Sequence, residues 1–331
     1  MGNWNELNES LIDLIGKTPV VRIRHLTGED DAALYVKLES FNPNSNSKDR
    51  TAYGIIREAE RCGQLKPGGT IFEITSGNTG IGLAAIGAAL GYKVVIYMGS
   101  HYNKERFDLL RAFGAKVVPF DKDEVDVDQL KEKLIKLQQI TPNSLFSNQA
   151  ANPANPSIHR ETTAKEILEQ TGGKLDAFVA TSGTGGTITG VGERLKEAIP
   201  GVTIHLVEPE NSRVVEGGEH GDHRIYGISP PKRPEVLNTE ILDGIIHISD
   251  EDAWQTARDM AQKEGLLVGP SSGAAVWGAI KVARELGKGK TVLALAPDTG
   301  ERYLSIGLYD EAHYQDDESL AAAELSNLLL L

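Results

Sequence analysis

Short apolar runs alternate with longer segments of helical period along most of the chain. Such alternation predicts parallel sheets joined by crossover helices, which is the α/β class. One predicted helix, Thr79–Leu90, is apolar on nearly every face and should be buried on all sides. The predicted strands are Thr70–Ile74, Lys93–Met98, Lys116–Phe120, Ala177–Ala180, Thr203–Val207 and Thr291–Ala296.

Helices are predicted between these strands from the period and from the residues at their ends. The segment 104–113 follows Asn103 as N-cap, and Ser249 caps a helix over 250–264. Leu130, Leu134 and Leu137 share one face of a further helix. One more helix is predicted to end before Pro200, and another to cover 272–286. The segment from Glu208 to Asn238 has no period, and a loop of this length is usually functional or mobile.

The composition limits the functions open to the chain. Its 331 residues suit two domains with a crevice between them, and a net charge of −13 without a basic cluster argues against nucleic-acid binding. The one cysteine excludes an internal disulfide, and no Cys/His spacing resembles a zinc site, so we expect no metal. The absence of a basic-then-apolar leader, and an apolar run over 80–92 too short for a bilayer, predict a cytoplasmic location without membrane contact.

Lys48 is the first candidate for chemistry. Ser47 is a plausible N-cap, and the apolar period beyond it predicts a helix with Lys48 in its first turn. The helix dipole and burial would both lower its pKa from about 10.4 toward the neutral amine that attacks a carbonyl. A solvated surface lysine is the alternative, and the short motif by itself favours it.

Two turns between a strand and a helix are rich in Gly, Ser and Thr. The first spans Thr75–Gly80 and the second Gly183–Thr187. Backbone amides at such a turn bind a carboxylate or a phosphate, although an ordinary strand–helix connection would use the same residues. The second turn lacks the dinucleotide and P-loop spacings, so a monophosphate fits it better. An amine facing two anion-binding turns suits pyridoxal phosphate, which carries an aldehyde and a phosphate.

Three further features have simple structural interpretations. Ser271 precedes the predicted helix over 272–286 and would serve as its N-cap. The segment 146–156, rich in amides and prolines, would be a linker between the two halves. His159, His220 and His223 have no neighbouring nucleophile or ligand pattern and are expected on the surface or in loops.

Taken in order, these segments resemble the cysteine synthase (O-acetylserine sulfhydrylase) family and its relative cystathionine β-synthase. The resemblance runs from Leu11 to Ser305 and is specific as an ordered set. It rests on residues 11–19, Asn42-Pro43, Ser47-Lys48-Asp49-Arg50, 75–80, Asn148-Gln149, 152–156, 183–187, Val207-Glu208-Pro209, Gly265-Leu266-Leu267 and 297–305.

The resemblance implies fold type II of the pyridoxal-phosphate enzymes, with the site between two α/β domains. It implies a smaller domain over 41–152, a larger one over 12–40 and 153–315, and a tail over 316–331. Lys48 would bind the cofactor covalently and act as general base in β-replacement on O-acetylserine by sulfide. Asn78 would bond the ring hydroxyl and Ser271 would face the ring nitrogen. The phosphate would be bound by Gly183, Thr184, Gly185, Gly186 and Thr187, and the substrate carboxylate by Thr75, Ser76, Gly77, Thr79 and Gln149.

One loop departs from the family pattern. Gly227–Pro234 carries Lys232 and Arg233 among several prolines, so O-phosphoserine as donor or homocysteine as acceptor is an alternative. A non-enzymatic anion- or nucleotide-binding α/β protein is another. The resemblance also implies a homodimer and, as a partner, the C-terminal peptide of a serine acetyltransferase.

Overall fold

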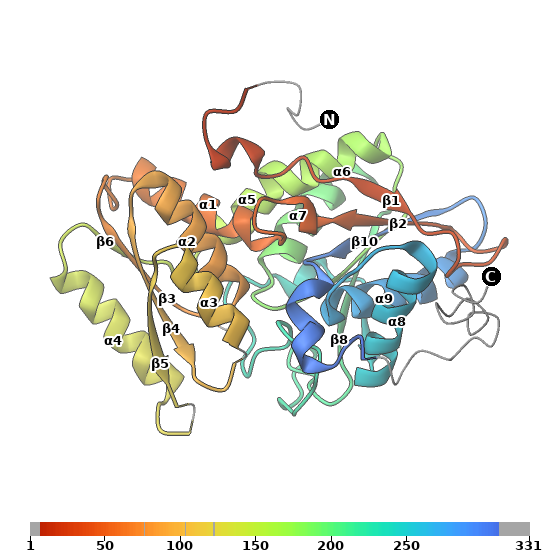
Figure 1. The fold of residues 1–331 in the computed structure, drawn as a ribbon. Coiled ribbons are helices and arrows are strands. Elements are labelled where there is room, and N and C mark those ends of the chain that lie inside the picture. Colours follow the sequence, from red (N-terminus) through yellow and green to blue (C-terminus); the bar gives the residue numbers. More distant parts are fainter. Residues whose placement is uncertain (1–6, 76, 103, 122, 311–331) are drawn as a thin grey trace, which may run out of the picture.

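Two separate β-sheets organise the protein, as the computed structural model shows for residues 7–75, 77–102, 104–121 and 123–310 (Figure 1). The larger sheet has six strands in the order β1-β2-β10-β7-β8-β9. Within it, β1 is antiparallel to β2 and every other pair is parallel. Its strands are β1 (Val20–Arg22), β2 (Ala33–Leu38), β7 (Ala177–Thr181), β8 (Thr203–Pro209), β9 (Gly244–Ile248) and β10 (Thr291–Ala296).

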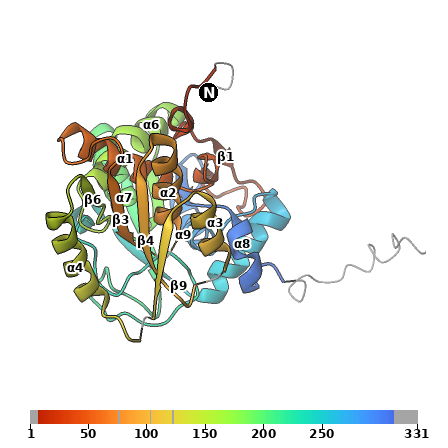
Figure 2. The same ribbon diagram turned by 60° about the vertical axis from the view of Figure 1, so that its left-hand side comes forward.

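The smaller sheet has four parallel strands in the order β5-β4-β3-β6. These are β3 (Thr70–Ile74), β4 (Lys93–Gly99), β5 (Lys116–Phe120) and β6 (Ser144–Phe146). Figure 2 turns this sheet toward the viewer. The α/β class predicted from the alternation is confirmed. The strands of the two sheets come from different stretches of the chain, and the domain limits at 41 and 152 remain a proposal.

Helices cover both sheets. They are α1 (Lys48–Arg61), α2 (Asn78–Leu90), α3 (Lys104–Ala112), α4 (Val127–Ile140), α5 (Ala154–Ile158), α6 (Ala164–Thr171), α7 (Gly186–Ala198), α8 (Asp250–Glu264) and α9 (Pro270–Leu286). Nine residues of α2 are buried, as its uniform apolarity predicts. Ser249 accepts a hydrogen bond from the Asp252 amide, which confirms it as the cap of α8.

Two helix starts differ from the sequence-based prediction. Helix α9 begins at Pro270 with Gly269 as N-cap, so Ser271 lies inside the first turn and is not the cap. Proline suits the first helical position, where its missing N–H removes no bond. Ser47 occupies the N-cap position of α1 without capping through its side chain. The side chain of Asn46 caps the helix instead, because its Oδ1 accepts a hydrogen bond from the Lys48 amide at 2.8 Å.

Some expectations fall outside the described residues, namely the binding role of Ser76, the cap at Asn103 and the tail over 316–331. The predicted loop beyond β8 is confirmed, since residues 210–238 contain neither helix nor strand. Among the helices of the described part of the chain, none combines the length and apolarity needed to cross a membrane.

Candidate active site

The candidate site lies where strands of both sheets end. Parallel strands place their carboxyl ends at one edge, and α/β proteins bind ligands outside that edge. The turn after β3 leads to α2, and the turn after β7 leads to α7. The segment after β10 meets the start of α1, because the Ser47 amide donates to the Pro297 carbonyl at 2.8 Å and Asn46 forms a β-bridge with Asp298.

Lys48 is the first residue of α1 and is partly buried. Its Nζ lies 3.4 Å from Ser47 Oγ. Burial lowers the pKa of the Lys48 amine, and the nearby carboxylates of Asp298 and Glu39 offset only part of that effect. A fraction of neutral amine larger than that of a surface lysine follows, which is what nucleophilic attack on a carbonyl requires.

The turn between β3 and α2 brings together the residues predicted to bind a carboxylate. Gly77 is the N-cap of α2 at φ 155° and ψ −85°, and among the described residues no side chain caps the helix. Its amide donates to Thr75 Oγ1 at 3.2 Å. Thr79, which is buried, donates through Oγ1 to Gln149 Oε1 at 2.6 Å. Thr79 and Gln149, far apart in sequence, therefore sit together at an uncapped helix N-terminus, where an anion is favoured.

Gln149 is itself held by a buried carboxyl group. Glu73, in β3, accepts from the Gln149 amide at 3.3 Å and from Ser147 Oγ. Burial raises the pKa of Glu73 to about 7, although these hydrogen bonds lower it. The 146–156 segment is thus not the plain linker expected from its composition. Its buried Asn155 donates from Nδ2 to Thr184 Oγ1 and to the Gln149 carbonyl, both at 2.9 Å.

The turn between β7 and α7 has the geometry of an anion cradle. Gly185, at φ 83°, is the N-cap of α7, and no side chain caps that helix. The backbone packs so closely that a Cβ on Gly183 would lie 2.4 Å from the Gly227 carbonyl oxygen. A Cβ on Gly186 would lie 2.0 Å from Asn155 Oδ1. Glycine is therefore required at both positions, and the first-turn amides of α7 are left to bind a phosphate.

Asp298 connects the start of α1 with α2 and with Gly269, the N-cap of α9, whose amide donates to the Asp298 carbonyl at 3.4 Å, a role that the sequence did not reveal. Its Oδ2 accepts from Asn78 Nδ2 at 2.7 Å and from Tyr303 Oη at 2.6 Å. Arg302 donates to Asn78 Oδ1. Asp298 is buried, and its Oδ1 has no hydrogen-bond partner among the described residues. The only sequence signal was that Asp298, Arg302 and Tyr303 belong to the segment 297–305 of the resemblance.

Buried polar groups without partners identify the space for a ligand. Ser272 Oγ in the first turn of α9 and Ser182 Oγ beside the α7 turn have none among the described residues. Ser271, predicted to face a ring nitrogen, is buried next to Ser272 in that turn. Helices α2, α7 and α9 each begin without a side-chain cap. These donors and the Lys48 amine fit a ligand with an anionic end and a carbonyl group.

The prediction that His159 is a surface or loop residue is wrong. His159 begins a π-helical segment after α5 and is fully buried. Its Nε2 lies 3.2 Å from Thr51 Oγ1 and from Thr187 Oγ1, and its Nδ1 lies 2.9 Å from Thr163 Oγ1. His159 thereby positions Thr187 of the α7 turn. Of the other two histidines, His220 is exposed and His223 partly buried, both in the 210–238 loop, as predicted.

We expect His159→Gln to reduce the loss of stability on acidification. Burial, followed by the charge of Arg50, lowers the pKa of His159 from 6.5 to about 3. The unfolded chain therefore takes up a proton below pH 6.5 that the folded protein does not, so stability is complete above pH 6.5 and falls as the pH drops toward 3. At pH 5 the loss is about 2 kcal/mol.

Urea unfolding at pH 5, 6 and 8 gives the slope of the free energy of unfolding against pH. This slope should be smaller in His159→Gln than in the parent protein. His220→Gln, which changes an exposed imidazole, is the matched control for the substitution itself. An unchanged slope in His159→Gln would contradict the neutral buried imidazole.

Comparisons with known proteins bear on this site. A family model described as "Pyridoxal-phosphate dependent enzyme" matches residues 11–298. A Bacillus subtilis protein named "Probable cysteine synthase" is 52% identical over 300 residues, covering 90% of this chain and 96% of the relative. The crystal structure of an O-ureido-L-serine synthase superposes with a TM-score of 0.89 at 42% identity, covering 96% of this chain and all of that one. A crystal structure of a cysteine synthase from Entamoeba histolytica superposes with a TM-score of 0.89 at 37% identity, covering 97% of this chain and 96% of that one.

Proposed function

The chain belongs to the pyridoxal-phosphate dependent enzyme family, and we propose that it is a cysteine synthase, which converts O-acetyl-L-serine and sulfide into L-cysteine and acetate. The observation that carries this proposal is the position of Lys48. Its amine, with a pKa lowered by burial, stands at the strand ends where three helices begin without side-chain caps.

The proposed cofactor residues fit pyridoxal phosphate chemically. When bound, the cofactor supplies an aldehyde that condenses with an amine and a ring that withdraws electrons from the substrate. The amides of Gly183 to Thr187 would hold the phosphate at the α7 N-terminus, with Thr187 oriented by His159. Asn78 would face the ring hydroxyl, oriented by Asp298 and Arg302. Ser271, in the first turn of α9, would face the ring nitrogen with a neutral hydroxyl.

The β3–α2 turn is the proposed site of the substrate carboxylate. Thr75, Gly77 and Thr79 present hydroxyls and amides at the uncapped end of α2, with Gln149 beside Thr79. Ser76 completes the proposed set. An anion here gains from the helix dipole and from charge-assisted hydrogen bonds. With the carboxylate fixed, the Lys48 amine would take the α-proton of the donor as acetate leaves, because a neutral amine is a competent general base.

We expect the enzyme to prefer O-acetylserine to O-phosphoserine by at least about 100-fold in kcat/KM. The two cations that suggested a phosphorylated donor lie on the surface. Lys232 is 77% exposed and forms an ion pair with Asp128 in α4, and Arg233 is also exposed. Steady-state kinetics with both donors and sulfide measure the ratio.

The same assay tests the activity as a whole. Cysteine formation from O-acetylserine and sulfide supports the proposal, whereas a yellow holoenzyme that forms none would contradict it. Homocysteine replaces sulfide in a second series, which tests the alternative acceptor. A preference for O-phosphoserine that Lys232→Ala and Arg233→Ala abolish would assign the donor site to the 227–234 loop.

Three expectations about context remain proposals. They are a homodimeric assembly, a cytoplasmic location, and binding of a serine acetyltransferase C-terminal peptide. The peptide proposal follows from the same turn, because a terminal carboxylate would suit the α2 N-terminus as the substrate carboxylate does. Competition between such a peptide and O-acetylserine would test it.

A further inference from the structure

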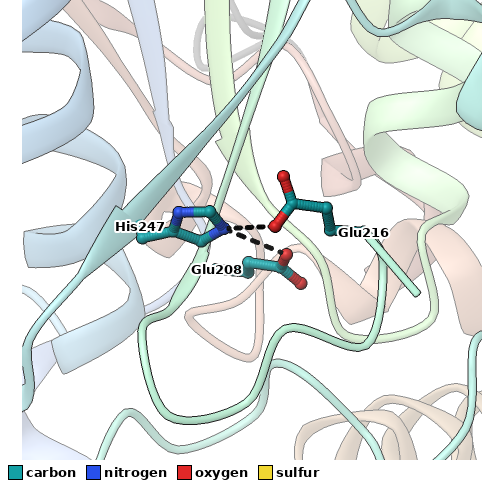
Figure 3. A group of neighbouring side chains, drawn as sticks. All are labelled: Glu208, Glu216 and His247. Carbon is teal, nitrogen blue, oxygen red and sulfur yellow. Dashed lines mark ion pairs between the residues drawn. The ribbon is translucent and has the colours of Figure 1, made fainter. Parts of the chain in front are cut away.

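Three side chains that the proposed reaction does not use converge beside the larger sheet. Glu208, in β8, and His247, in β9, are register partners on adjacent parallel strands. Glu216 belongs to the turn over 214–217, in the loop that follows β8. Figure 3 shows both carboxylates directed at the imidazole. His247 Nε2 lies 3.2 Å from Glu216 Oε2 and 3.6 Å from Glu208 Oε1.

Glu208 is the unusual member of this group. Its side chain is only 2% exposed. One oxygen, Oε2, accepts from the Val215 amide at 3.0 Å and so fixes the turn that carries Glu216. The other, Oε1, has no hydrogen-bond partner among the described residues and faces the imidazole. A buried carboxylate oxygen without a donor is costly, so such a group normally faces a cation or a donor that completes it.

The spacing of the three ligand atoms suits a small divalent cation. Glu208 Oε1, Glu216 Oε2 and His247 Nε2 all lie within 4.8 Å of one another. Zinc binds carboxylate oxygen and imidazole nitrogen at about 2.0–2.2 Å, so tetrahedral ligands are separated by about 3.4 Å. The distances of 3.2 and 3.6 Å bracket this separation. Glu216, 53% exposed, leaves a path for the ion to enter.

We propose that Glu208, Glu216 and His247 form a site for a divalent cation of the zinc type, with a fourth position left for water. The sequence predicted no metal, because these ligands come from two strands and a loop and lack any Cys/His spacing. The site contains none of the residues proposed to bind the cofactor or the substrate.

The cation would hold the start of the 210–238 loop against the sheet. The same loop contacts the proposed phosphate turn farther along, where the Ser229 amide donates to the Ser182 carbonyl at 2.9 Å. The Gly227 carbonyl also packs against Gly183. A cation bound through Glu216 would therefore restrain a segment that supports the α7 turn. Its role is structural, and turnover does not depend chemically on it.

Calorimetric titration of EDTA-treated holoenzyme with ZnCl₂ tests the site. Cys62 is exposed and is the only cysteine, so all measurements use Cys62→Ser to exclude a thiol ligand. We expect one zinc ion per chain. Glu216→Gln and His247→Gln should each weaken binding by more than about 100-fold, since even outer-shell partners of a metal contribute 10–100-fold. These partly exposed positions are changed in place of the buried Glu208, whose loss could prevent folding.

Glu219→Gln and His220→Gln are the matched controls, because they change an exposed acid and an exposed imidazole of the same loop. Both should bind zinc like the parent. Saturating zinc should also raise the Tm of the parent and not that of His247→Gln. If the three residues formed only an ion pair and the protein showed no saturable zinc binding, the proposal would be overturned. Zinc binding that survives in both Glu216→Gln and His247→Gln would also overturn it.

Discussion

Lys48→Ala should lower kcat/KM for cysteine formation by at least about 10⁴-fold, the upper range of what one general base contributes. The expected loss is large because the proposed roles of covalent anchor and proton acceptor fall on the same amine. No other described lysine lies at the start of α1, where burial lowers the pKa of the Lys48 amine and Asp298 is close. Among the described residues, the hydrogen bond of its Nζ is to Ser47 Oγ, so its removal should leave the contact between Thr79 and Gln149 intact.

Initial rates with O-acetylserine and sulfide measure the effect, and the visible spectrum of the purified variant reports whether the cofactor is still attached. Lys66→Ala is the matched control, since Lys66 is exposed in the same half of the chain. It should leave both the rate and the spectrum unchanged. Full turnover by Lys48→Ala would end the assignment of this lysine and, with it, the proposed mechanism.

Arg50→Leu should lower the free energy of unfolding by about 3–5 kcal/mol, because it leaves the buried carboxylate of Glu39 without its ion-pair partner. Arg50, two residues after Lys48, is 1% exposed. Its guanidinium donates to Glu39 at 2.8 and 3.0 Å and to Glu166 at 2.7 and 2.8 Å. Burial alone would raise the pKa of Glu39, but the charge and hydrogen bonds of Arg50 hold it at about 2.

The sign of the pH effect follows from that lowered pKa. The stability that Glu39 contributes is present above its ordinary pKa of 4.5 and is lost as the pH falls through about 2. Arg50→Leu should therefore be far less stable than the parent at pH 7, and the difference should shrink in acid. Urea unfolding of the two proteins at pH 7 and pH 3.5 measures it.

Arg61→Leu is the matched control, because Arg61 forms the same type of ion pair with Glu58 on the same helix but is 73% exposed. Its loss should cost less than about 1 kcal/mol. If the two variants were equally destabilised, the buried network would not be what fixes α1. A smaller penalty in the combined Arg50→Leu, Glu39→Leu protein would confirm that the unpaired carboxylate causes the loss.

Elements defined by local pattern were predicted well from the sequence. Strands β3, β5 and β10 and helix α8 have the predicted bounds, and the Ser249 cap is confirmed. Their signals lie within a few residues, as apolar period, capping side chains and terminal glycines. Strand β2 was not predicted, although it forms the parallel partner of β10 in the buried sheet. Five of its six residues are apolar, and the sixth, Lys37, is buried among the side chains of Glu166 and Gln170 from α6 and the Thr18 carbonyl, all of which it contacts through Nζ.

The residues of the candidate site, like the helices and strands, were predicted where their signal is local in the sequence. The lysine at a helix start and the two Gly/Ser/Thr turns were recognisable, because amines, backbone amides and hydroxyls at helix N-termini have a chemistry that short motifs encode. The order of these motifs carried the family resemblance, and with it the expected cofactor. The sequence by itself thus determined the chemical inventory of the site and the class of the fold.

The tertiary structure alone decided which distant groups complete that inventory. It buries His159 against Thr187, connects Asp298 to Asn78, and brings Glu208, Glu216 and His247 within reach of one ion. No local pattern encodes these contacts, because each joins segments that meet only when strands of a sheet align and loops fold back over their ends. Burial then sets the charge of each group, since the cost of removing it from water depends on neighbours that the chain order does not specify.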